Sequence, residues 1–87
     1  MTDNRSNRII PPGETISELL YMRDMTEKDL SRKLHKDLQF VKRLLEGNEL
    51  LTPEIAHSLY LAFGIEDSFW LNLEILYRNE LRAISDG

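Results

Sequence analysis

Signals that begin and end helices recur at short intervals along this chain, and they constrain its fold more than any other feature of the sequence. Pro11, Pro12 and Gly13 precede a helical pattern that we expect to begin at Glu14. Thr26, Asp37 and Thr52 with Pro53 are residues that favour the first positions of helices, while Gly47 and Gly64 favour the position just after a helix ends. The chain is therefore predicted to be divided into short helices joined by short turns.

Apolar residues between these signals recur three and four positions apart, as on one face of a helix. The first such set is Ile16, Leu19 and Leu20, and the second is Leu30 and Leu34. The spacing predicts helices over residues 14–24, 27–34, 38–46, 53–63 and about 67–84, and strand-like alternation is absent. The fold class is thus predicted to be all-α, with five helices.

A chain of 87 residues is expected to form one small domain, here residues 12–84, after a flexible segment over residues 1–11. The absence of cysteine excludes disulfides, cysteine zinc fingers, iron–sulfur sites and thiol nucleophiles, and it is compatible with a cytoplasmic protein. No apolar run approaches the roughly 20 residues of a membrane helix. His35 and His57 lack metal-ligand spacing, and no catalytic set is visible. We therefore expect no enzyme activity, metal, cofactor, small-molecule substrate or membrane.

Positive charge is concentrated in one part of an otherwise acidic chain. The net charge is -4, but residues 28–43 hold six basic and two acidic residues, whereas residues 44–87 hold two basic and eight acidic residues. A locally basic segment can contact DNA phosphates while the acidic remainder stays away from them. A solvated pair of helices is the alternative interpretation of the same charges.

The second and third predicted helices are separated by only about three residues, and the third has basic residues on its outer face. This is the pattern of a helix-turn-helix, in which the second helix of the pair enters the major groove of DNA. Gln39 could bind adenine, and Lys42 or Arg43 could bind a phosphate or a guanine edge. The full set of candidate DNA-contact residues is Lys28, Arg32, Lys36, Asp37, Leu38, Gln39, Phe40, Lys42, Arg43 and Asn48.

The last predicted helix carries apolar residues on more than one side. Phe69 is expected in the core, as aromatic residues at helical spacing usually are. Because so small a unit has little core, other apolar residues of this helix are expected to lie between two protomers. The candidates for a homodimer interface are Trp70, Leu73, Ile75, Leu76, Tyr77, Leu81 and Ile84.

The stretch from Thr26 to Gly47 resembles the helix-turn-helix of the Xre/Cro-like (lambda-repressor-like) proteins. Three further blocks, Pro12 to Glu14, Leu51 to Glu54 and Phe69 to Glu74, occur in the order and spacing typical of HigA/VapI-type antitoxins. The resemblance covers about residues 9 to 78. It implies a dimeric antitoxin that binds double-stranded operator DNA, represses its own operon and neutralises a RelE-like, mRNA-cleaving toxin.

The sequence departs from that family pattern at two places. His35 and Lys36 stand where the turn usually has a glycine and an aliphatic residue, so Lys36 is expected to extend into solvent. Leu38 and Phe40 stand at the start of the third helix, where polar residues are commoner. These departures leave open an interaction module that has lost DNA binding. A stand-alone phage or bacterial transcriptional regulator also remains, because the sequence does not separate it from an antitoxin.

Overall fold

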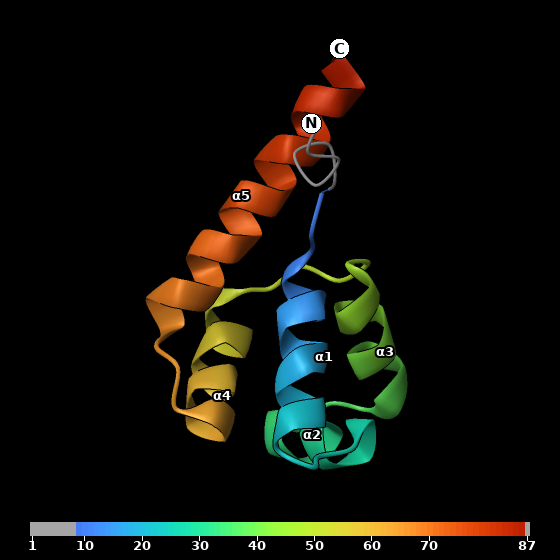
Figure 1. Cartoon of the computed structure of the whole chain (residues 1–87), viewed down its shortest axis with the longest axis vertical. Coiled ribbons are helices and arrows are strands. Elements are labelled where there is room, and N and C mark those ends of the chain that lie inside the picture. The colour runs from blue at the N-terminus through green and yellow to red at the C-terminus, as the bar shows by residue number, and fades with distance from the viewer. Residues whose placement is uncertain (1–8, 87) are drawn as a thin grey trace, which may run out of the picture.

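The computed structural model describes residues 9–86, which form five helices (Figure 1). These are α1 (Pro12–Met22), α2 (Glu27–Leu34), α3 (Leu38–Glu46), α4 (Pro53–Phe63) and α5 (Asp67–Asp86). No strand occurs within the described range. The predicted all-α class with five helices is confirmed. Most of the N-terminal segment for which flexibility is expected, residues 1–8, lies outside the described residues.

Side-chain caps begin three of the helices where the sequence predicted. The Thr26 hydroxyl accepts from the Asp29 N–H at 3.1 Å and the Asp29 carboxylate accepts from the Thr26 N–H at 2.9 Å, which is a complete capping box. Asp37 and Thr52 each cap with one bond, to the N–H of Phe40 and of Ile55. The backbone N–H of Thr26 is the main cause that lowers the pKa of Asp29, and the Thr26 hydroxyl and Arg32 act in the same direction.

The predicted bounds are wrong by two residues at each end of α1, which begins at Pro12 rather than at Glu14 and ends at Met22 rather than at residue 24. Proline is compatible with the first helical position because its missing N–H would have no partner there. The second residue of α1, Gly13, must be small because α3 lies against it. A Cβ at this position would be 2.2 Å from the carbonyl oxygen of Leu45. At the other end of the chain, α5 continues to Asp86, beyond the expected end near Ile84.

The core draws buried side chains from all five helices. Trp70 of α5 has no exposed surface, and its indole N–H donates to the carbonyl oxygen of Ile65 at 3.1 Å. Trp70 is therefore a core residue of the protomer, which corrects its assignment to a dimer interface. Phe69, expected in the core, is 42% exposed and meets Trp70 edge to face. The remaining core residues are Ile16, Leu19, Leu20, Leu30, Leu34, Val41, Leu44, Leu51, Ile55, Ala56, Leu59 and Phe63.

The long helix α5 determines the shape of the molecule. Its first turns pack on α4, and its C-terminal part extends past the other four helices (Figure 1). The described chain accordingly measures 40 × 27 × 24 Å along its principal axes. No helix in the part of the chain that the structure describes is both long and apolar enough to cross a membrane.

Candidate DNA-binding face

The turn between α2 and α3 is closed by backbone hydrogen bonds and by Ser31. His35 adopts the left-handed conformation with φ of 57°, which histidine tolerates better than most residues that have a Cβ. The Lys36 N–H donates to the carbonyl oxygen of Ser31 at 3.1 Å, and the Ser31 hydroxyl donates to the carbonyl oxygen of Lys36. The turn therefore forms without the usual glycine, and the Lys36 side chain is exposed, as the sequence predicted.

Helix α3 has one buried side and one accessible side. Val41 and Leu44 are in the core, while Gln39, Lys42 and Arg43 are exposed. This separation of buried and exposed residues leaves a polar, cationic side of α3 available for a groove of DNA.

Phe40 lies between the two sides of α3. It is half-buried against the core, and its ring centre lies 5.3 Å from the Lys36 ammonium and 6.0 Å from the Arg43 guanidinium carbon. These are distances at which a cation interacts with a ring face. Leu38 is also half-buried. The apolar start of α3 thus contacts protein, and Phe40 supports two of the candidate DNA-binding cations.

Three of the candidate DNA-contact cations are paired with carboxylates. Arg32 bonds to Asp29 at 3.0 Å, Lys42 to Glu27 at 3.0 Å and Arg43 to Glu49 at 2.9 Å. Such exposed pairs contribute about 0–1 kcal/mol each, so phosphate oxygens can replace Asp29 and Glu27 as the partners of Arg32 and Lys42 at little cost. Lys28, Lys33 and Lys36 form no ion pair with any other residue in the range 9–86.

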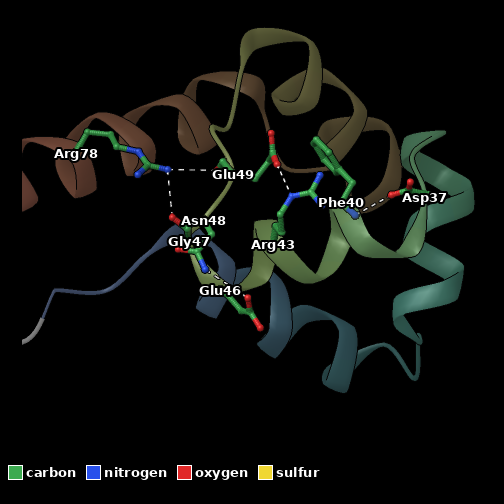
Figure 2. A network of polar contacts seen from close by, with 8 residues as sticks. All are labelled: Asp37, Phe40, Arg43, Glu46, Gly47, Asn48, Glu49 and Arg78. Carbon is green, nitrogen blue, oxygen red and sulfur yellow. Dashed lines mark hydrogen bonds and ion pairs between the residues drawn. The ribbon is translucent and has the colours of Figure 1, made fainter.

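Two further candidates have roles inside the protein. The Asp37 carboxylate accepts from the Phe40 N–H at 2.8 Å and so caps α3. Asn48 is exposed, its backbone N–H donates to the Arg43 carbonyl oxygen at 2.8 Å, and its side-chain amide lies 3.4 Å from Glu46 (Figure 2). Both residues therefore shape the two ends of α3.

The loop after α3 is also bound to α5, a contact that the sequence interpretation missed. Arg78 donates to the carbonyl oxygens of Gly47 and Glu49 (Figure 2). It also donates to the carboxylate of Glu74. Glu74 and Arg78 are four residues apart on a helix, a spacing that could have suggested their pairing. No comparable signal exists for Arg43 with Glu49, because the two residues lie on a helix and on the loop that follows it.

The structure divides the candidate dimer residues of α5 into two groups. Ile75, Leu76 and Ile84 are 55%, 59% and 64% exposed. Leu73, Tyr77 and Leu81 are partly buried, and Leu73 packs against the core. The three side chains of the exposed group are available to contact another molecule.

Among the residues that the structure describes, no cluster of three or more histidine and acidic side chains is arranged to hold a metal ion. His57 contacts Asp67 at 3.1 Å, and these two residues form an exposed pair rather than a metal site.

Comparison with known proteins gives one curated relative and several solved structures. No family model matches the chain. The curated relative is YddM of Escherichia coli K12, described as an uncharacterised HTH-type transcriptional regulator. It is 33% identical over 63 residues, which are 72% of this chain and 67% of YddM.

Three similar structures cover 92% of this chain. One is an addiction module antidote protein of a HigA family from Coxiella burnetii, with a TM-score of 0.82, 31% identity and 88% of its own chain covered. The second is the Pseudomonas aeruginosa antitoxin HigA with the higBA promoter, with a TM-score of 0.85, 26% identity and 88% of its chain covered. The third is a P. aeruginosa protein in complex with its 18-bp operator DNA, with a TM-score of 0.83, 26% identity and 87% of its chain covered.

Proposed function

Because the chain belongs to the HigA-type family of helix-turn-helix antitoxins and regulators, we propose that it is an antitoxin that represses its own operon by binding operator DNA. The observation that carries the proposal is the exposed side of α3, on which Gln39, Lys42 and Arg43 are accessible while Val41 and Leu44 are buried. Two similar structures contain promoter or operator DNA, which supports the same use of this fold here.

The three exposed residues have different proposed roles. Gln39, in the first turn of α3, can form paired bonds with adenine, and the Arg43 guanidinium can do so with guanine. Lys42 is a point charge suited to a phosphate, which would position the protein without reading sequence. Lys28, Arg32 and Lys36 are proposed as further phosphate contacts.

A gel-shift titration with the DNA upstream of the protein's own gene tests this proposal. The wild-type protein is expected to bind that DNA, and its affinity should fall steeply with salt concentration as phosphate contacts are lost. Lys42→Ala should weaken binding to all sequences and reduce the salt dependence by about one charge, whereas Arg43→Ala should cost about 1–3 kcal/mol and relax sequence preference.

Arg82→Ala is the matched control, because Arg82 is an exposed cation of α5 whose side chain bonds only to Asn79 within residues 9–86. It removes one positive charge and should leave operator affinity nearly unchanged. The absence of any shift at low salt, with the protein shown to be folded, would refute the DNA-binding proposal and leave an interaction module.

The proposed toxin partner is a basic, RelE-like RNase. The solved relative from C. burnetii is described as an antidote protein of an addiction module, and residues 44–87 of this chain are strongly acidic, which suits a basic partner. The test is co-expression with the product of the adjacent gene. Restored growth together with a co-purifying complex supports the antitoxin, whereas the absence of both results would refute the toxin partner.

A stand-alone transcriptional regulator is the second candidate function, and the description of YddM as a transcriptional regulator favours it. It shares the DNA-binding face and differs only in lacking a toxin. Operator binding without any toxin gene beside this one would therefore support the regulator.

A further inference from the structure

Within residues 9–86, the hydrogen bonds from α5 to the loop over residues 47–49 come from the side chain of Arg78. Arg78 Nη2 donates to the carbonyl oxygen of Glu49 at 3.2 Å and to that of Gly47 at 3.5 Å, and Arg78 Nε donates to Glu74 at 2.8 Å. The side chains of Arg78 and Glu74 are only 29% and 11% exposed. A planar guanidinium with several donors can bridge a carboxylate and two carbonyls at once. The α3–α4 loop is therefore fixed to α5.

Glu49 of the same loop bonds to Arg43 of α3 (Figure 2). The Glu49 carboxylate accepts from Arg43 Nε at 2.9 Å, and the Phe40 ring lies beside the guanidinium. No hydrogen bond within residues 9–86 uses the two terminal amino groups of Arg43. A guanidinium held through Nε has both terminal groups available for a ligand with two neighbouring acceptors.

We propose that Arg78 is a positioning residue for DNA recognition: it fixes Glu49, and Glu49 holds Arg43 so that both terminal amino groups meet the O6 and N7 atoms of a guanine. This inference rests on the proposed function, since it requires α3 to enter the major groove. Arg78 is separated from Arg43 by Glu49 and acts only through the loop. An arginine that is already ordered loses less conformational freedom on binding than a mobile one.

The test compares affinity for operator DNA with affinity for a scrambled duplex of the same length, using the full chain. In Arg78→Met the ratio of the two affinities should fall about two- to tenfold, the range expected when one long side chain must be ordered on binding. Affinity for the scrambled duplex should stay within about twofold, because a phosphate contact is not what Arg78 supports. An equal loss on both duplexes, or an unchanged ratio, would overturn the proposal.

Two further variants keep the test decisive if Arg78→Met does not fold. Arg78→Lys preserves the charge beside Glu74, but one ammonium cannot reproduce the fork that joins the carboxylate and both carbonyls, so the ratio should again fall. Arg82→Met removes one positive charge one turn further along α5 and should keep the wild-type ratio.

A double variant tests whether Arg78 acts through Arg43. Combining Arg43→Ala with Arg78→Met should give no further loss beyond Arg43→Ala alone, whereas additive losses would contradict the proposed connection.

Glu49→Gln separates positioning from simple competition between Glu49 and DNA. If Glu49 only competed for Arg43, loss of its charge would strengthen binding to both duplexes equally and overturn the proposal. Positioning instead predicts a lower ratio of operator to scrambled affinity.

A measurement without DNA distinguishes failure of this inference from failure of the proposed function. The Arg43 Nε–H signal in the NMR spectrum of the free protein should be sharp and slowly exchanging in the wild type and in Arg82→Met. It should broaden or exchange faster in Arg78→Met and Arg78→Lys, and an unchanged signal would overturn the inference. Wild-type protein that binds neither duplex while showing these NMR differences would refute the DNA-binding function alone.

Discussion

At the scale of single residues, Gly47 and Gly64 show two different reasons why glycine is needed just after a helix: backbone conformation and close packing. Both have positive φ, 83° and 79°. A Cβ on Gly47 would lie 2.7 Å from Tyr77 Oη and 3.0 Å from Pro11 Cβ, whereas a Cβ on Gly64 would have no atom within 4 Å. Gly64 is thus required by backbone conformation, and Gly47 by conformation and close packing together.

Alanine substitutions should therefore have unequal costs. We expect Gly64→Ala to lower the free energy of unfolding by about 1–2 kcal/mol through the left-handed backbone. Gly47→Ala should lower it by at least about 1 kcal/mol more, because neighbouring atoms must move. Urea titration followed by the fluorescence of the buried Trp70 measures both at one protein concentration. Equal losses would show that the contacts of Gly47 carry no cost.

The sequence predicted the role of a residue when its partner lies close to it along the chain. Thr26, Asp37 and Thr52 cap helices through bonds to residues three positions away, so local sequence was sufficient to predict them. Contacts between distant segments were not predictable in this way. The sequence suggested neither Glu49 as the partner of Arg43 nor Arg78 as the residue that holds the loop. The assignment of Trp70 to an interface was wrong because the side chain is fully buried in the core of its own protomer.

At the scale of helices, α1 shows how tertiary packing can conceal a helix start. Pro12 and Gly13 suggested a break, yet both are buried in the first turn of α1. The reason for the glycine is the backbone of Leu45 on α3, which only the folded structure places there. The starts of α2, α3 and α4 needed no such information, and the sequence predicted each of them.

The contact between α1 and α3 predicts a reversal of normal helix propensity. In an exposed helix interior, replacing glycine by alanine stabilises by about 1 kcal/mol. Gly13→Ala should instead destabilise the protein by about 1–3 kcal/mol, because its Cβ would overlap the Leu45 carbonyl group. Thermal unfolding should show a decrease in Tm of several degrees. Ser17→Ala, at an exposed position of α1, is the control and should leave Tm unchanged or slightly raised. A rise in Tm for Gly13→Ala would contradict the close approach of α1 and α3.

At the scale of the whole molecule, the exposed apolar residues of α5 predict how two copies associate. Leu76 is 59% exposed, as expected for a residue that a second protomer covers. We expect a solution mass of twice the 10.2 kDa of one chain, and Leu76→Glu should convert this dimer into monomers because a carboxylate would be buried at the interface. Light scattering after size-exclusion chromatography measures the mass.

The control for the dimer is Leu61→Glu on α4, where the leucine is 71% exposed. This variant should remain dimeric if α5 provides the interface. Dissociation by Leu61→Glu but not by Leu76→Glu would place the interface elsewhere. Since two recognition helices should contact half-sites about 34–36 Å apart, the monomeric variant should also bind a full operator more weakly than the wild type.

Pro11, Gly47 and Tyr77 lie close together in the fold although they are far apart in the sequence. Pro11 and Tyr77 lie beside Gly47, the first residue of the α3–α4 loop, although neither belongs to the helix-turn-helix. If the protein represses transcription as proposed, selection for loss of repression should recover changes near Pro11, Gly47 and Tyr77, three stretches that are far apart in sequence and meet in the fold.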